Sequence, residues 1–225
     1  MSAELKPIAY RQTRLLALLL IWCVALVSFR VVRTGSYFYT FLVWNLFLAC
    51  LPLMLSRLLR AAHARRTGIA AELSLAATWL LFLPNAPYIL TDWVHLRFGS
   101  TLQYGFDALL IISCAGTGLL LGYASLFDVH AIVAKRFGNR WGWIVAAASL
   151  MLSGFGVYLG RVERWNSWDV IANPHGLIAS IVDCLLNPTR HLDVFAMSGI
   201  FSMALLLGYA AMHSIARRAE IRIAE

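Results

Sequence analysis

An aspartate and a histidine that could carry out chemistry, Asp92 and His95, follow an apolar stretch that prolines interrupt. Residues three apart on a helix lie on one face, so Asp92 could act as a base with His95 supporting it. The alternative is a purely structural hydrogen bond between the two side chains. A metal ion would need more ligands, for which Asp107, Asp169 and His175 are candidates. We assign Asp92 and His95 as candidate catalytic residues and assign no metal site.

A second polar cluster, residues 161–169, follows a later apolar stretch. Its arginines, Arg161 and Arg164, could bind a phosphate or carboxylate group through two hydrogen bonds each. The alternative is that these arginines and the neighbouring tryptophans only anchor a membrane helix at the lipid surface. Together with the polar residues near Asp92, this cluster gives a set of candidate binding residues: Asn85, Tyr88, Asp107, Arg161, Arg164, Asn166 and Asp169.

The amino-acid composition indicates whether water or lipid surrounds most of the chain. Hydrophobic residues make up 60% of the 225 residues and charged residues only 13%, compared with about 25% charged residues in soluble proteins. The mean hydropathy is +0.72. A soluble domain of this length could not bury so much apolar surface, so we expect an integral membrane protein. The net charge of +8 is then explained by basic residues that anchor helix ends, and we expect no nucleic-acid partner.

The hydropathy pattern predicts an all-α fold, a single membrane domain over residues 1–225 with six spans. Each span is close to the ~20 residues that cross a bilayer. The basic, apolar N-terminal segment is interpreted as the first span and not as a cleaved signal peptide, and Arg30 at its end is expected to extend to the membrane surface. The predicted spans are 15–32, 37–55, 69–90, 108–127, 141–160 and 194–214.

The distribution of basic residues predicts the orientation. Of the 19 Lys and Arg residues, 13 fall in the two terminal segments and in the connections after the second and fourth spans. Basic residues are enriched on the cytoplasmic side, so both termini should be cytoplasmic. All the candidate site residues then belong to the opposite, extracytoplasmic side.

The prolines near Asp92 should break the third span before it reaches that side. Pro84 and Pro87 flank Asn85, and the helix before them is only about 22 Å long at ~1.5 Å per residue. In lipid, irregular backbone is tolerated where protein buries it or where it lines a wet cavity. The alternative is a simple kink at the helix end, and Asn85 and the polar residues after Tyr88 favour a cavity.

The long connection between the fifth and sixth spans should contain a helix of its own. Apolar residues recur at helical spacing over 177–186, a segment too short to span. We expect an interfacial helix on the outer leaflet, ended by Asn187 and Pro188. Within the spans, Gly118 with Gly122 and Gly156 with Gly160 could permit close helix crossings. The four cysteines form no Cys-x-x-Cys motif, and we expect neither disulfides nor metal binding from them.

The combined motifs resemble a known family of bacterial multi-pass membrane proteins, domain of unknown function 1361 (DUF1361). The resemblance implies a multi-pass protein of the bacterial cell (inner) membrane and implies no particular activity. It rests on the run Phe82-Leu83-Pro84-Asn85-Ala86-Pro87-Tyr88, on Thr91-Asp92, on Asp107, on Gly160-Arg161 and on Arg164-Trp165-Asn166-Ser167-Trp168-Asp169.

Three functions are compatible with this pattern. The first is a polar site at the extracytoplasmic face that binds or processes a polar lipid or an envelope precursor. The second is a non-catalytic structural or assembly role, in which the same charges only hold the bundle together. The third is a transporter component, although most predicted spans lack the mid-membrane ionisable residues that mark transport pathways. The sequence identifies no cofactor and leaves enzymatic activity and oligomeric state open.

Overall fold

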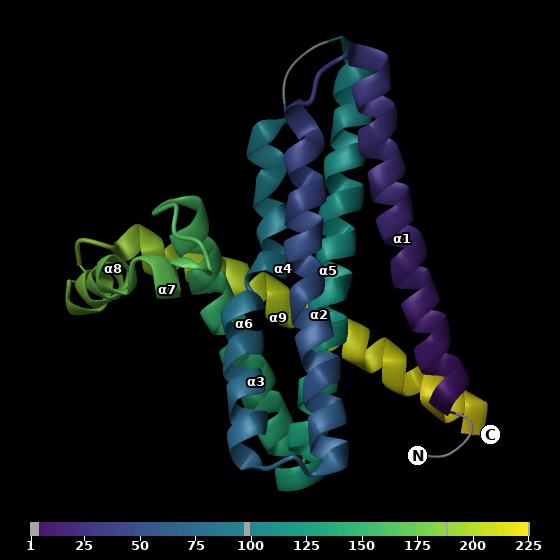
Figure 1. Cartoon of the computed structure of the whole chain (residues 1–225), viewed down its shortest axis with the longest axis vertical. Helices are drawn as coiled ribbons and strands as arrows, with labels where there is room; N and C mark the ends of the chain where they lie inside the picture. The colour runs from purple at the N-terminus through teal and green to yellow at the C-terminus, as the bar shows by residue number, and fades with distance from the viewer. Residues whose placement is uncertain (1–4, 97–99, 188, 225) are drawn as a thin grey trace.

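The computed structural model describes residues 5–96, 100–187 and 189–224, with side chains between residues 13 and 218 of these ranges. These ranges contain helices and no strand (Figure 1). In chain order the helices are α1 (Leu5–Thr34), η1 (Phe38–Thr40), α2 (Phe41–Arg65), α3 (Ile69–Phe82), α4 (Asn85–Tyr88), η2 (Ile89–His95), α5 (Thr101–Phe137), α6 (Asn139–Arg161), α7 (Asp169–Ala172), α8 (Pro174–Leu186) and α9 (Leu192–Ala224).

Six helical segments are long and apolar enough to cross a membrane, as predicted. They are Thr13–Thr34, Phe38–Arg65, Ile69–His95, Thr101–Phe137, Asn139–Arg161 and Leu192–Arg218. The spans are longer than the hydropathy pattern indicated, because charged residues continue the helices. Arg60 of α2 and Asp128 of α5, for example, lie beyond the predicted span ends and form an ion pair of 2.5 Å.

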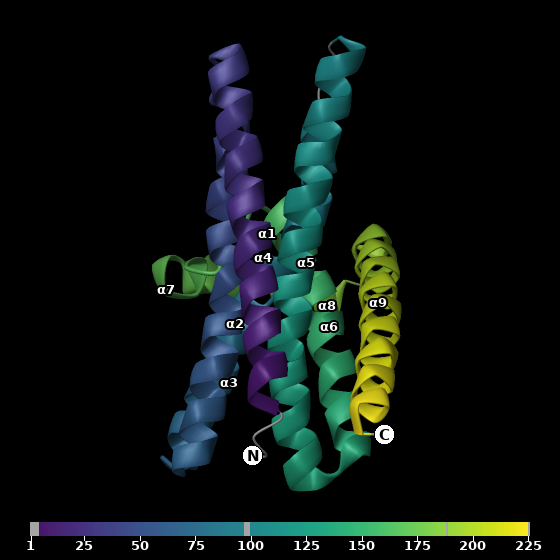
Figure 2. The same ribbon diagram turned by 90° about the vertical axis from the view of Figure 1, so that its right-hand side faces the viewer.

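The connections that precede α6 alternate between the two ends of the bundle, whereas the connection with α7 and α8 projects sideways from its middle (Figure 1). The α1–α2 connection and the start of α5 lie at the upper end, and the α2–α3 and α5–α6 connections lie at the lower end. The start of α1 and the end of α9 both lie toward the lower end, as Figure 2 also shows. Successive long helices up to α6 therefore run in opposite directions.

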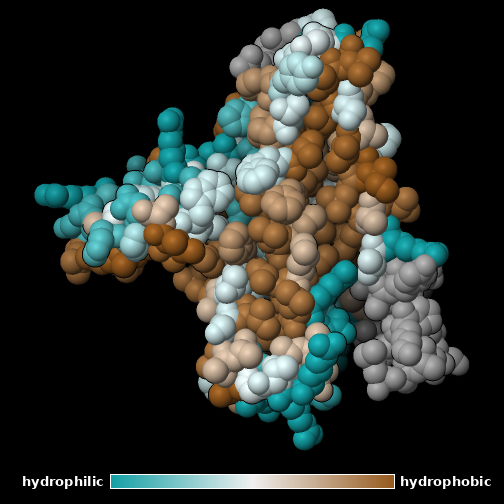
Figure 3. Space-filling view, viewed as in Figure 1, coloured by the Kyte–Doolittle hydropathy of each residue, from teal (hydrophilic) through white to brown (hydrophobic). Residues whose placement is uncertain are grey.

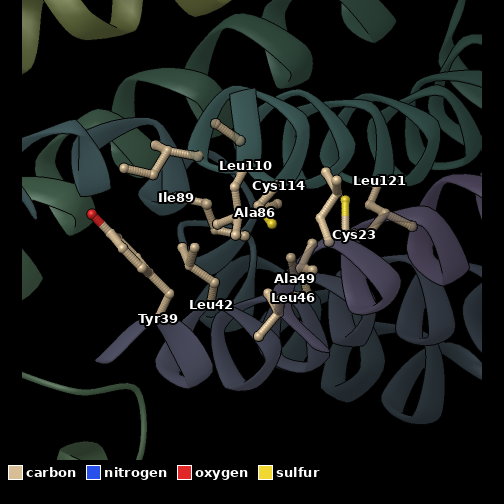
Figure 4. Packing of buried hydrophobic residues seen from close by; sticks show 14 of the residues in the cluster. Cys23, Tyr39, Leu42, Leu46, Ala49, Ala86, Ile89, Leu110, Cys114 and Leu121 are labelled. Atoms are coloured by element: carbon tan, nitrogen blue, oxygen red, sulfur yellow. The ribbon is translucent and has the colours of Figure 1, made fainter. Parts of the chain in front are cut away.

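The long helix α5 is the centre of the packing and contacts α1, α2, α4, η2 and α6. One apolar cluster joins α1, α2, the α4–η2 segment and α5, and Figure 4 shows its side chains, among them Leu42, Ile89, Leu110 and Cys114. A second cluster joins α3, α5, α6 and α9 around Trp79 and other buried residues. The long helices therefore bury one side against their neighbours and leave apolar side chains exposed on another side, where lipid can cover them.

The predicted break in the third span is confirmed: α3 ends at Phe82, and the chain continues as the short helices α4 and η2. The segment at the break packs directly against two glycines of α5, Gly118 and Gly122. A Cβ atom on Gly118 would lie 2.8 Å from the carbonyl oxygen of Ala86, and one on Gly122 would lie 2.8 Å from the Ala86 Cβ. Ala86 is fully buried, so protein encloses this part of the irregular backbone.

The helix α6 contacts the other side of the break through a second pair of glycines. A Cβ atom on Gly156 would lie 2.7 Å from Pro84 Cγ, and one on Gly160 would lie 3.1 Å from the ring of Tyr88. Both glycine pairs identified from the sequence are thus positions of close helix approach. They hold the α4 segment between α5 and α6 and bring the end of α6 next to η2.

The connection between α6 and α9 contains the predicted extra helix as α8. It begins earlier than 177, because the Asn173 side chain accepts a hydrogen bond of 3.1 Å from the Gly176 amide and Pro174 occupies the first turn. It ends at Leu186, and the Pro188 predicted to end it lies outside the described residues. In Figure 3 the projection formed by α7 and α8 is hydrophilic on its upper side and hydrophobic on its lower side.

Candidate functional site

Arg161, the last residue of α6, makes more polar contacts than the other candidate side chains. Its Nε donates to Thr91 Oγ1 at 2.8 Å, and its Nη2 donates to Asp92 Oδ1 at 2.5 Å. Its Nη1 lies 3.2 Å from His95 Nε2. The guanidinium also lies over the ring of Tyr88, 4.4 Å from its centre, a distance at which a cation and an aromatic face attract each other. One arginine therefore fastens α6 to α4 and η2.

Asp92 is buried, with an exposed fraction of 1%. Its Oδ1 accepts the bond from Arg161, and its Oδ2 accepts a bond of 2.8 Å from Asn45 Nδ2 of α2. Each carboxylate oxygen thus has a donor, one of them charged. The structure brings α2, η2 and α6 together at this carboxylate.

His95 lies on the same side of η2 as Asp92, because residues three apart are eclipsed on a 3-10 helix. The direct bond between Asp92 and His95 considered above is not formed, and Arg161 contacts both residues. A guanidinium has only donors, so His95 Nε2 is the acceptor in its contact with Arg161. The ring packs against Phe41, with 5.1 Å between ring centres, and the Tyr39 hydroxyl donates to the His95 carbonyl oxygen at 3.1 Å.

Asp107 does not join this group, contrary to the expectation that it would complete a set with Arg161. It lies inside α5, not at its start, and forms a second buried ion pair with Arg30 of α1. Arg30 Nε donates to Asp107 Oδ1 at 2.5 Å and Nη2 donates to Oδ2 at 3.0 Å. The expectation that Arg30 would extend to the membrane surface is wrong, because Arg30 is buried. Tyr39 connects the two pairs, since its ring lies 5.6 Å from the Arg30 guanidinium.

The remaining candidates lie in and around the turn after α6. The Asn85 side chain donates to Ser167 Oγ at 3.1 Å, and the backbone N–H of Asn166 donates to Asp169 Oδ2 at 2.6 Å. The first bond attaches the turn to the break in the third span, and the second lies within the turn, where it meets α7. Arg164 is exposed and adopts a left-handed conformation, with φ of 61°. Among the described residues it has no ion-pair partner.

Of the nine candidates, Tyr88, Asp92 and His95 therefore contact Arg161. Asp107 forms a separate ion pair, and the other four belong to the surface turn or bond to it. Sequence reasoning missed four contributors to the buried contacts. Three carried a visible signal: Asn45 and Arg30 are polar residues within apolar stretches, and Thr91 directly precedes Asp92. The fourth, Tyr39, carried none. Between residues 13 and 218, in the parts described, no group of three or more His, Cys, Asp or Glu side chains is placed to hold a metal ion.

A polar cluster on the surface ties the end of α8 to the start of α9. His191 Nε2 lies 2.9 Å from Asp183 Oδ2, and Asn187 Nδ2 donates to Asp183 Oδ1 at 2.7 Å. The bond from His191, and then that from Asn187, hold the pKa of Asp183 below its ordinary value. These contacts fix the way in which the α7–α8 projection returns to the bundle.

Comparisons with known proteins give one match. Neither the curated proteins nor the solved structures include a protein that matches the chain. A family described as "Protein of unknown function (DUF1361)" matches residues 44–216. The matched range contains Asn45, Asp92 and Arg161 and the turn after α6, and it excludes Arg30 and Tyr39. Because this range covers most of the chain, the protein belongs to the DUF1361 family.

Proposed function

We propose that this protein is a binding protein of the bacterial inner membrane that holds an anionic head group, of a lipid or an envelope precursor, at the extracytoplasmic face. The observation that carries the proposal is Arg164, an exposed arginine without an ion pair among the described residues, on a turn next to an amphipathic helix. Arg161 and Asn166 flank it along the chain. In this proposal both termini are cytoplasmic, as the distribution of basic residues predicts.

The turn that carries Arg164 is held in place before any ligand arrives. The Trp165 amide donates to the Leu159 carbonyl oxygen at 3.0 Å, and Ser167 and Asp169 are bonded as described above. Because the backbone of the turn is already fixed, binding has to order the arginine side chain and not the turn as well. Phosphate and carboxylate groups fit its planar set of donors, so a phosphate-bearing head group is the ligand chemistry that the turn fits.

The helix α8 supports a ligand at the lipid surface. Ile178, Val182 and Leu185 are exposed, by 58%, 43% and 59%, and recur at helical spacing along one side. A helix with such a side binds in the plane of a membrane surface. In Figure 3 this projection continues the hydrophobic surface of the bundle on its lower side. We therefore place α8 on the outer leaflet, where Arg164 would meet lipid phosphates.

The contacts of Asp92 support binding over chemical processing. A general base needs an oxygen within reach of the proton that it removes. Both oxygens of Asp92 accept bonds from Asn45 and Arg161, and the carboxylate is buried. We assign to Asp92 and His95 the role of holding Arg161, and through it the end of α6.

The test compares two exposed arginines. Arg33, in the last turn of α1, is exposed like Arg164 and has no ion pair among the described residues. Wild type, R164A and R33A are reconstituted in nanodiscs that contain phosphatidylcholine with a minor fraction of phosphatidylglycerol, and retained lipid is counted by native mass spectrometry. R164A should retain several-fold less phosphatidylglycerol than wild type, and R33A should retain as much. Equal retention in all three contradicts the proposal. A parallel arm with inorganic phosphate as competitor distinguishes a free anion from a lipid head group.

A structural or assembly role is the second candidate. It is favoured by the two buried ion pairs, whose charged atoms contact protein groups from α1, α2, η2, α5 and α6. In that case R164A and R33A would behave alike, whereas changes at Asp92 or Asp107 would reduce the amount of folded protein.

A further inference from the structure

A groove lies between α1 and α2, at the upper end of the bundle where a short connection joins the two helices (Figure 1). Its volume is about 620 Å³. The apolar side chains that form its walls are Val27, Val31 and Val32 of α1 and Val43, Trp44 and Phe47 of α2. Both helices belong to the six segments that can span a membrane. In a bilayer the groove therefore opens toward acyl chains.

The groove exists because α5 holds both helices. α1 packs mainly against α5, where Arg30 is bonded to Asp107. One to two turns deeper, Cys23 Sγ lies 3.3 Å from Thr117 Oγ1 of the same helix. α2 also packs against α5, and its Leu42 is fully buried in the shared apolar cluster. Since each helix is fixed to α5, a space remains between their outer sides.

The polarity of the groove changes along its length. At its upper end Tyr37 is exposed, and Thr40 Oγ1 donates to the Tyr37 carbonyl oxygen at 2.8 Å. Tyrosine is enriched where a membrane meets water. Deeper in the groove Ser28 is the one polar residue among those that line it, and none of the lining residues is charged. The groove thus complements a ligand with a polar group at one end and an uncharged hydrocarbon at the other.

The length of the groove fits a lipid chain better than a helix of a second copy. Along α2 it extends from Thr40 to Phe47, roughly 10 Å at ~1.5 Å per residue. The hydrocarbon of one leaflet is about 15 Å deep, so most of an acyl chain would lie inside. A spanning helix needs about 30 Å, and spanning helices approach one another closely through small residues. Neither glycine nor alanine lines the groove.

We propose that the groove between α1 and α2 binds one acyl chain of a phospholipid and retains it more tightly than the lipids around the rest of the bundle. A chain in the groove contacts two walls, and it gains dispersion contacts that a chain on a single helix surface lacks. The head group lies at the level of Tyr37. Because no charged side chain lines the groove, the site takes zwitterionic and anionic phospholipids alike. It is independent of the head-group site proposed at Arg164.

The first test counts retained lipids. Wild type, V31F, V43F and V24F are reconstituted in nanodiscs of phosphatidylcholine alone and transferred to detergent, and bound lipid is counted by native mass spectrometry. V31F and V43F fill the groove from its two walls, and each should retain one phosphatidylcholine fewer than wild type. Val24 is exposed on α1 and does not line the groove, so V24F should retain as many as wild type.

Three results would overturn the proposal. Both filling variants could retain as many lipids as wild type, or V24F could lose as many as they do. Native masses could also show a dimer that V31F and V43F dissociate, which would make the groove a contact between two copies. The filling variants lie on different helices, so one decides if the other fails to fold. R164A should match wild type in these nanodiscs, which separates this result from that of the head-group proposal.

Trp44 gives a second readout, local to the groove. Bromine atoms on an acyl chain quench the fluorescence of an indole that they contact, and the contribution of Trp44 is the difference made by W44F in each background. With brominated phosphatidylcholine as the retained lipid, this contribution should be quenched in wild type and recover in V31F. A Trp44 contribution that brominated lipid leaves unchanged in wild type would show that no chain occupies the groove.

Discussion

The two buried ion pairs should respond differently to the loss of their carboxylate charge. Asp92 and Asp107 are each 1% exposed, so burial of the acid alone predicts equal costs for D92N and D107N. Their arginines differ, because the side chain of Arg161 is 22% exposed and that of Arg30 is 9% exposed. After D92N, Arg161 can turn toward water and retain its contact with Thr91. After D107N, Arg30 keeps an uncompensated charge inside the protein.

The magnitudes follow from these environments. Removing one partner of a buried pair costs about 3–5 kcal/mol when the other charge stays buried, which applies to D107N. In D92N the new amide can still accept from Arg161, and Asn45 can rotate its own amide to face it, so a cost of about 1–2 kcal/mol is expected from one weakened bond. R161M reverses the situation at the first pair. It leaves the Asp92 carboxylate buried with only Asn45 as donor, and should cost about 3–5 kcal/mol.

The assay is the free energy of unfolding of each variant in the same detergent or bicelle, from reversible denaturation or steric trapping. The expected order of destabilisation is D107N and R161M above D92N. A matched double variant, D92L with R161M, should cost less than the sum of its single changes, because it removes both charges together. The reasoning is refuted if D92N destabilises as much as R161M, since the exposure of the partner would then have no effect.

Two further predictions concern the packing and the surface. G122A should destabilise by about 1–3 kcal/mol, the usual cost of overpacking, because its Cβ would meet Ala86. A Cβ atom added at Gly116 would have open space around it, so G116A should be neutral or slightly stabilising because alanine has the higher helix propensity. The free energies of unfolding of the two variants are compared, and equal effects would contradict the close approach at Gly122. At Asp183, the lowered folded-state pKa means that its stabilising contribution is present above the unfolded-state value of about 3.9 and disappears as the pH falls through the folded-state value. The difference between the unfolding midpoints of wild type and D183N at pH 6 should therefore shrink as the pH falls below about 3.9, and a constant difference would argue against the His191–Asp183 bond.

The number of spans was predictable because lipid imposes a simple requirement on each segment. An apolar run of sufficient length must cross the bilayer, and the six runs stand out in the sequence. The ends were less predictable, because Arg60 and Asp128 continue α2 and α5 by pairing with each other. A hydropathy profile ends each span before these charged residues, although the two charges compensate each other and the helices continue.

The polar segments that contain the candidate site were predictable, whereas the ion pairs between their residues were not. The break at Pro84 and Pro87 and the polar turn after α6 are local features, and the sequence contains them. Which acid binds which arginine depends on helix neighbours. The balance of charges indicated pairing, but it did not reveal that α1 lies against α5 and brings Arg30 to Asp107. Asp107 was grouped with Arg161 in one set of candidate binding residues, and the structure instead pairs Asp107 with Arg30 and Arg161 with Asp92.

The same pairs explain how the helices select their neighbours. In lipid, apolar side chains gain little by leaving the acyl chains for another helix, so apolar surface alone does not choose a partner. Close contacts and polar bonds must choose, and this chain has both in the same places. The glycines of α5 and α6 admit the α4 segment, and Arg161 then reaches Asp92. Arg30 and Asp107 make the corresponding choice between α1 and α5. A carboxylate inside a membrane span is costly unless it is paired, so each pair favours one arrangement of helices over those that would leave its charges apart.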